Sequence, residues 1–150
     1  MENTETIPKK QHDEDIKKLR ELYRPNNAFN VPVNSALDFF KWWCIFLRPF
    51  IPLTDREVEV VASFLNQRWK LVKSNNISDP AILDTLMMSK EVLNEVIKEC
   101  HITKQHFYVV MSSLKKKNVI NEHINAKLIP NVKDDGLFKL TILFKATDAA

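Results

Sequence analysis

Glycine is almost missing from this chain, since Gly136 is the only one among 150 residues. Walker loops, GxGxxG dinucleotide loops and GxSxG nucleophile elbows each need at least two glycines. These motifs are therefore excluded, and with them the usual routes to nucleotide-dependent and α/β-hydrolase chemistry. We expect a protein that is not an enzyme and holds no cofactor.

Cysteine is also scarce, with only Cys44 and Cys100, far apart in the sequence. They form neither a disulfide framework nor a zinc spacing, which indicates a reducing compartment. Cys100, His101 and His106 lie close together, but a zinc site needs three or four ligands that converge tetrahedrally. We expect a small buried thiol, two surface histidines and no metal. The polar segment 1–15 lacks the apolar run of a secretory signal.

Charge of one sign does not dominate, because the net charge is +3 and 27% of the residues are charged. A dedicated nucleic-acid binder usually carries a more basic domain, so this value permits such a partner without requiring one. Hydrophobic residues make up 45% of the chain, enough for one real core. We expect one domain over residues 52–150 and an N-terminal extension over residues 1–51.

The stretch 89–117 organises this domain. Ser89 can cap a first helix, residues 100–102 make a turn, and Thr103 can cap a second helix. The apolar positions of the second helix, Phe107, Val110, Met111 and Leu114, follow the spacing of a buried helical face. The pattern predicts a helix-turn-helix.

The flanking segments extend this motif. Residues 52–73 read as a helix that begins with a Thr54–Glu57 capping box, and a short helix over 80–88 starts with Pro80. Downstream, INAKLIP, a turn containing Asp135-Gly136 and the alternating run LFKLTILF predict a β-hairpin with its tip at 130–136. The fold class expected is mainly α with a small β-hairpin: a winged helix-turn-helix domain plus an N-terminal helical extension.

Residues 103–117 carry four lysines and no acid. In a helix-turn-helix that binds DNA, the N-terminal side chains of the second helix touch base edges and nearby cations meet phosphates. The first group would be Lys104, Gln105, His106 and Tyr108, and the second would be Lys115, Lys116, Lys117 and Lys133. Alternatively, the lysines only complement the helix dipole. The predicted DNA-contacting residues include no arginine. The acids Glu91, Glu95 and Glu99 of the preceding helix would also repel phosphate if they faced the same way.

The N-terminal third contains an amphipathic helix over 12–24, a linker with two prolines and an aromatic segment over 34–51. The aromatic residues of that segment are Phe39, Phe40, Trp42, Trp43, Phe46 and Phe50. They fit either a helix buried against the core or a partner interface. A membrane span is disfavoured because Lys41 and Arg48 interrupt the segment and Pro49 ends it well short of about 20 residues.

The runs LTDREVEVVASF, MSKEVLNEVIKECHITKQHFYVVMSSLKKKNVI, INAKLIPN and FKLTILF resemble small winged-helix proteins of tailed phages, including crAss-like phages of Bacteroidetes. The resemblance covers roughly residues 52–145 and contains no catalytic motif. It implies a phage origin and a non-enzymatic role, either as a regulator or as a virion component near the portal and tail.

Two functions are therefore expected from different classes. The first is a virion structural protein, a ring or connector subunit between head and tail, which would form a homo-oligomer and bind portal, ring or tail proteins through the aromatic segment. It would reside in the virion, and in the host cytoplasm during assembly. The second is a regulator of transcription or replication that binds duplex DNA.

Overall fold

The computed structural model describes residues 9–22, 31, 33–132, 138, 145 and 146 of the chain. The chain divides into two compact units, Met1–Pro32 and Val33–Ala150. The first unit contributes helix α1 (Lys9–Leu22), within which the Gln11 amide donates a hydrogen bond of 3.2 Å to Asp15. The amphipathic helix predicted over 12–24 is therefore present and begins three residues earlier.

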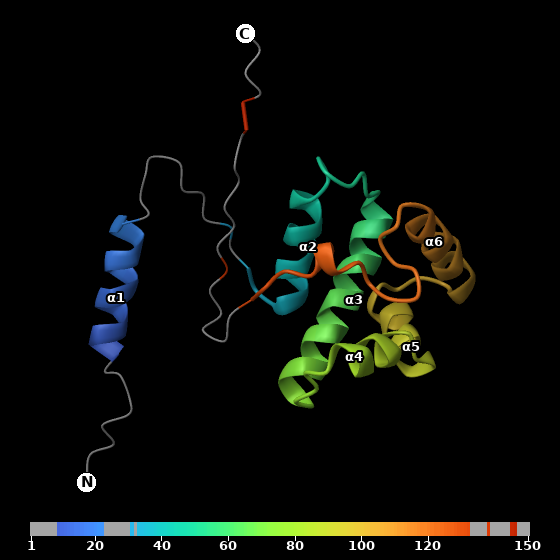
Figure 1. The fold of residues 1–150 in the computed structure, drawn as a ribbon, viewed down its shortest axis with the longest axis horizontal. Helices are drawn as coiled ribbons and strands as arrows, with labels where there is room; N and C mark the ends of the chain where they lie inside the picture. Colours follow the sequence, from blue (N-terminus) through green and yellow to red (C-terminus); the bar gives the residue numbers. More distant parts are fainter. Residues whose placement is uncertain (1–8, 23–30, 32, 133–137, 139–144, 147–150) are drawn as a thin grey trace. The chain divides into compact units, whose positions relative to one another are not determined.

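The second unit is built around one long helix, α3 (Asp55–Ser74), which contacts each of the other four α-helices of that unit. In Figure 1, α2 and α6 lie on opposite sides of α3. The other elements of the unit are α2 (Ala36–Phe46), α4 (Pro80–Met87), α5 (Lys90–Glu99), α6 (Lys104–Lys116) and the short 3-10 helix η1 (Ala126–Leu128).

Each α-helix of this unit begins at a side chain that caps its free backbone N–H groups. Ser35, Thr54, Asp79, Ser89 and Thr103 accept these hydrogen bonds for α2 to α6 in order. The capping box predicted for α3 is confirmed: the Thr54 hydroxyl accepts from Glu57 N at 3.2 Å and the Glu57 carboxylate accepts from Thr54 N at 2.9 Å.

The scarcity of glycine has a structural consequence at three turns. Asn76, His101 and Asn118 adopt positive φ angles of 52°, 53° and 58°, a region that glycine occupies more easily. His101 follows α5 and Asn118 follows α6, so ends that often carry glycine here carry larger residues.

The core forms where the apolar faces of these helices meet on α3. Phe64 of α3 and Phe107 of α6 are fully buried, with ring centroids 6.1 Å apart. α2 closes the other side of α3 with Phe40 and Cys44, so this helix shares the core of the domain that the sequence prediction began at residue 52.

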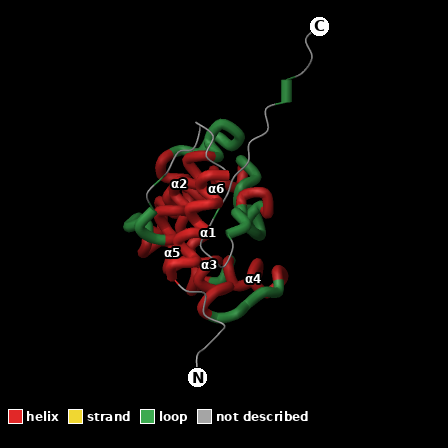
Figure 2. Tube along the Cα trace, turned by 90° about the vertical axis from the view of Figure 1, so that its left-hand side faces the viewer, coloured by secondary structure: helices red, strands yellow, loops and turns green. Residues whose placement is uncertain are grey.

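The predicted β-hairpin is wrong. The described residues contain no strand (Figure 2), and their only β pairing is an isolated antiparallel bridge between Ile120 and Ile124. The segment INAKLIP forms η1, in which the Asn125 side chain accepts a hydrogen bond from Lys127 N at 3.1 Å. The winged-helix assignment does not stand, because the described residues are helical and contain no strand. Most of the predicted tip and second strand, 133–137 and 139–144, lies outside those residues.

The spacing of buried residues explains this correction. Ile120, Ile124 and Leu128 are buried at intervals of four, whereas a half-buried strand alternates at intervals of two. The Leu128 carbonyl accepts a 2.7 Å hydrogen bond from the Trp43 indole instead of entering a strand ladder. The chain after α6 is therefore fastened to α2. The structure confirms two parts of the prediction, a mainly α fold and the α5–turn–α6 pair.

Candidate functional site

The aromatic segment has two faces with different surroundings. Phe40 is 3% exposed, and Phe39 and Trp43 are partly buried against the same core. Trp42 and Phe46 are each 48% exposed, and Phe50 is 68% exposed. Only these last three of the six predicted interface residues are thus free to meet a partner.

Ile45 joins the exposed group, at 42% exposed. Trp42, Ile45 and Phe46 follow the i, i+3, i+4 spacing of one helical face, and Phe50 lies four residues beyond the end of α2, in the turn that follows it. We call Trp42, Ile45, Phe46 and Phe50 the α2 patch. Sequence reasoning missed Ile45 because it counted aromatic rings, although the spacing from Trp42 would have found it.

The α2 patch exists because α2 is apolar on nearly all sides. Asp38 and Lys41 are the only charged residues among its eleven, so burying Phe40 and Cys44 against α3 leaves apolar side chains on the outer face. Soluble monomers rarely expose contiguous apolar patches larger than a few hundred Å², and the largest patch of such a protein often has a functional role.

Several contacts hold α2 firmly in place. The Phe39 ring packs edge-on against Phe40 at 5.3 Å and Phe138 at 5.1 Å between centroids. Trp43 packs against Phe138 at 5.3 Å and donates its indole N–H to the Leu128 carbonyl. The patch is therefore presented on a helix that long-range contacts fix, and not on a loose segment.

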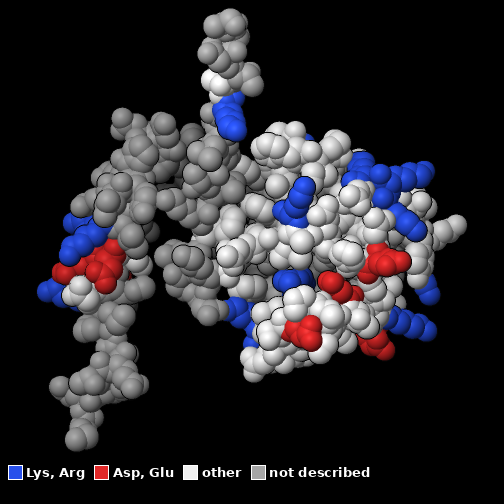
Figure 3. Space-filling view, viewed as in Figure 1, with Lys and Arg blue, Asp and Glu red and all other residues white. Residues whose placement is uncertain are grey.

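Helix α6 has a second exposed surface of different chemistry. Phe107, Val110 and Leu114 face the core, as the spacing predicted. We call the opposite side the α6 face, and its exposed residues are Lys104, Gln105, Tyr108, Val109, Ser112, Lys115 and Lys116. No acid occurs in α6, and basic side chains gather over this helix in Figure 3.

The remaining three predicted DNA-contacting residues are His106, Lys117 and Lys133. His106 is exposed at the edge of the α6 face, because it lies one turn before Val109 but nearly opposite Tyr108 around the helix. The Lys117 ammonium group donates 2.6 Å hydrogen bonds to the Glu57 carboxylate and the Pro52 carbonyl, so it is bound within the fold. Lys133 lies outside the described residues.

Glu57 is the buried acid that holds Lys117. It is 2% exposed and accepts hydrogen bonds from Thr54, Ser113 and Lys117. Burial acts to raise the pKa of Glu57, but the hydrogen bonds from Lys117, Thr54 and Ser113 outweigh it and lower that pKa below its ordinary value. The carboxylate therefore ties the start of α3 to the end of α6.

The acids of α5 do not all face solvent. The Glu99 carboxylate accepts hydrogen bonds from Ser63 at 2.7 Å and from Asn66 at 3.2 Å, so it points to α3. Glu91 and Glu95 are exposed. Of the three carboxylates expected to repel phosphate, that of Glu99 is thus hydrogen-bonded to α3.

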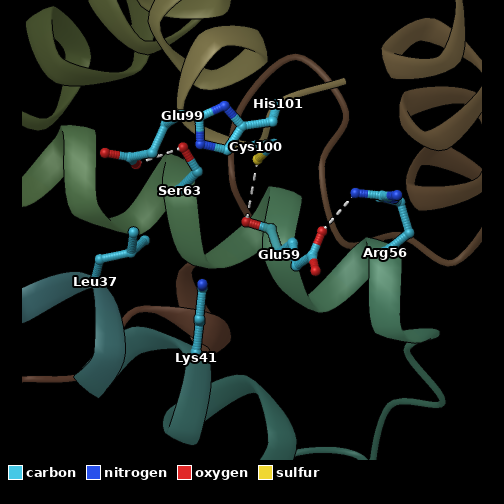
Figure 4. Close-up of a pocket in the computed structure, with 8 residues that line it drawn as sticks. All are labelled: Leu37, Lys41, Arg56, Glu59, Ser63, Glu99, Cys100 and His101. Atoms are coloured by element: carbon cyan, nitrogen blue, oxygen red, sulfur yellow. Dashed lines mark hydrogen bonds and ion pairs between the residues drawn. The ribbon is translucent and has the colours of Figure 1, made fainter. Parts of the chain in front are cut away.

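A shallow pocket of about 140 Å³ lies where α2, α3 and the α5–α6 turn meet (Figure 4). Arg56 and Glu59 pair with each other across 2.7 Å, which leaves the acid engaged. The Cys100 thiol donates to the Glu59 carbonyl at 3.5 Å, and burial raises its pKa to about 11. The thiol is protonated at neutral pH and is a poor nucleophile. The pocket is lined by Leu37, Lys41, Arg56, Glu59, Ser63, Glu99, Cys100 and His101.

Neither a metal site nor a membrane-spanning helix is found in the described part of the chain. No three His, Cys, Asp or Glu side chains converge there as a metal site would require, and His101 and His106 are both exposed. None of the helices there combines the length and hydropathy needed to cross a membrane.

Comparisons with known proteins give no further guide to the site. Neither models of protein families, nor curated proteins, nor solved structures yield a match to this chain.

Proposed function

We propose that this protein is a structural subunit of a protein assembly, and that the assembly is the head-to-tail connector of a tailed phage. The observation that carries the proposal is the α2 patch, where three apolar side chains of an otherwise packed helix, and Phe50 just after it, remain exposed. The sequence resemblance to tailed-phage proteins supports the choice of assembly.

The composition of the α2 patch suits a protein interface. Tryptophan and other aromatic residues carry much of the binding energy in such interfaces. A rigid presentation also favours binding, because less side-chain and backbone entropy is lost when the partner docks. The patch sits on a helix whose inner face is already fixed by Phe40 and Trp43.

The test uses the full chain with the portal and tail proteins encoded in the same genome. The purified proteins are mixed and binding is measured by calorimetry. We expect the double variant Trp42→Glu, Phe46→Glu to bind at least about thirtyfold more weakly, since losing one hot-spot residue costs about 2 kcal/mol. Val109→Glu is the matched control, because Val109 is exposed but lies on α6. Equal affinities for the wild type and the double variant, or no binding by the wild type, would count against the proposal.

A second candidate function is duplex-DNA binding through the α6 face. The observation that favours it is an exposed helix side with Lys104, Lys115 and Lys116 and no acid within α6. Such lysines contact phosphates and release counterions, so affinity would fall steeply with salt. Gln105 and Tyr108 lie on the same side, where polar side chains could contact base edges.

A further inference from the structure

We infer that the first partner of the α2 patch is a second copy of this chain, with the α2 helices of the two copies packed against each other in antiparallel orientation. The inference rests on the proposed function, because it names a partner for the surface assigned there. Three properties of the patch support it: its position among the other apolar residues, its charge and its size.

Within the part of the chain that the structure describes, the patch gathers more exposed large apolar side chains than any other segment. Among the described residues, the large hydrophobic side chains that remain exposed are Val31, Val33, Trp42, Ile45, Phe46, Phe50, Ile82, Tyr108 and Val109. Four of them form the patch, while Tyr108 and Val109 stand among lysines on α6 and Ile82 stands on α4. An apolar contact between two copies is therefore best made patch to patch. A two-fold axis produces this arrangement because it uses the same surface on both subunits.

Charge selects the orientation of the two helices. The exposed positions from Trp42 to Phe50 on this face carry no charged side chain. Asp38 lies one turn before Trp42, and at the other end Arg48 pairs with Asp55 across 2.5 Å. A parallel pair would bring the two Asp38 carboxylates together, whereas an antiparallel pair places them at opposite ends.

The size of the patch limits the strength of the contact. Aromatic side chains bury about 150–250 Å² each, so three that are about half exposed, with Ile45, offer roughly 300–400 Å² per copy. A standard stable interface buries about 800 Å² on each partner. The α2 pair is therefore a weak, reversible dimer in isolation, and other surfaces must add to it in a larger assembly.

Disulfide trapping tests the geometry directly. Ile45 lies near the middle of the patch, so the two-fold axis would bring the side chains at position 45 of both copies together. The variant Ile45→Cys should form a linked dimer under mild oxidation, because a disulfide requires Cα atoms within about 7 Å. The native thiols should not compete, since burial raises the pKa of Cys44 to about 12 and that of Cys100 to about 11.

Matched controls separate a specific contact from collision. Val109→Cys places an exposed thiol on α6 and should give little dimer. Asp38→Cys should also give little, because an antiparallel pair holds these positions apart. Equal trapping at positions 45 and 109, trapping that is strongest at position 38, or none at position 45 would overturn the inference.

Sedimentation equilibrium of the unmodified chain provides the second measurement. We expect a monomer–dimer equilibrium whose dissociation constant rises about tenfold or more in Phe46→Glu and is unchanged in Val109→Glu. A wild-type chain that stays monomeric at millimolar concentration overturns the inference. The proposed function is judged separately by calorimetry with portal and tail proteins, so the two can fail independently.

Discussion

Helices α2 and α6 lie on opposite sides of α3, and each buries one face and exposes the other. α6 is an ordinary amphipathic helix, with Phe107 and Leu114 inside and lysines outside. α2 is apolar on both sides, with Phe40 inside and Trp42 and Phe46 outside. Both helices leave apolar side chains exposed: Tyr108 and Val109 of α6 stand beside lysines, whereas Trp42, Ile45 and Phe46 of α2 form an outer face without an exposed charged side chain.

The same difference separates the partners that the two surfaces suit. Apolar side chains on α2 gain free energy when they leave water, so this surface favours a protein partner. The α6 face gains from counterion release, so it favours a phosphate backbone and loses affinity with salt.

The sharpest test compares the inner and outer phenylalanines of α2. We expect Phe40→Ala to destabilise the fold by about 3–5 kcal/mol, since it empties a fully packed site. Phe46→Ala should change the free energy of unfolding by less than about 0.5 kcal/mol, because the ring is half exposed. Urea denaturation measures both. Similar losses in the two variants would mean that the outer face of α2 is part of the core.

The second test concerns the ion pair that ties α6 to α3. Replacing Lys117 with methionine leaves the buried Glu57 carboxylate without its cation, and we expect a loss of about 2 kcal/mol at neutral pH. The same substitution at Lys116 is the control, because that side chain is exposed on α6. Thermal or urea unfolding at pH 7 gives the difference, and equal stabilities of the two variants would contradict it.

The pH dependence of this loss has a definite sign. The pKa of Glu57 is lowered in the folded protein, so its contribution to stability is present above the unfolded pKa, near 4.3. It is lost as the pH falls through the folded pKa. The stability gap between the wild type and Lys117→Met should therefore be full at pH 7 and shrink below about pH 4. A gap that grows on acidification would assign the effect to another group.

The third test asks whether the α6 face binds DNA. The triple variant Lys104→Ala, Lys115→Ala, Lys116→Ala should reduce the slope of log affinity against log salt by about 3 if each lysine meets one phosphate. Lys127→Ala, on η1, should leave the slope unchanged. Fluorescence anisotropy with a labelled duplex at several salt concentrations measures this. An unchanged slope in the triple variant would remove the second candidate function.

The sequence predicts the helices well because their signals are local. Thr54, Ser89 and Thr103 cap the helices they were expected to cap, and the spacing of Phe107 and Val110 gave the buried face of α6. Local patterns fail where the outcome depends on long-range packing. The segment 124–130 lacks the alternation of a strand, and a hydrogen bond from Trp43, 85 residues before Leu128, helps to hold its end.

The candidate surfaces, too, are predicted from local sequence only in part. Composition predicts a core helix or an interface for the aromatic segment as a whole, without assigning single residues. Phe40 faces inward and Phe46 outward because of where α3 lies. Lys117 continues the lysine run of α6 in the sequence, but its ammonium group donates a hydrogen bond to the buried Glu57 carboxylate. No local pattern contains that information, because the two residues are 60 positions apart.

The smallest effect tests the left-handed turn that separates α5 from α6. His101 has a φ angle of 53°, where a side chain beyond Cα costs about 1 kcal/mol relative to glycine. His101→Gly should therefore stabilise the fold by about 0.5–1 kcal/mol, measured by urea denaturation. Ser112→Gly, inside α6, should do the opposite by a similar amount, since glycine is unfavourable in a helix interior. If both variants lose stability, the His101 side chain contributes contacts that outweigh its backbone strain, and the turn is fixed by more than its φ angle.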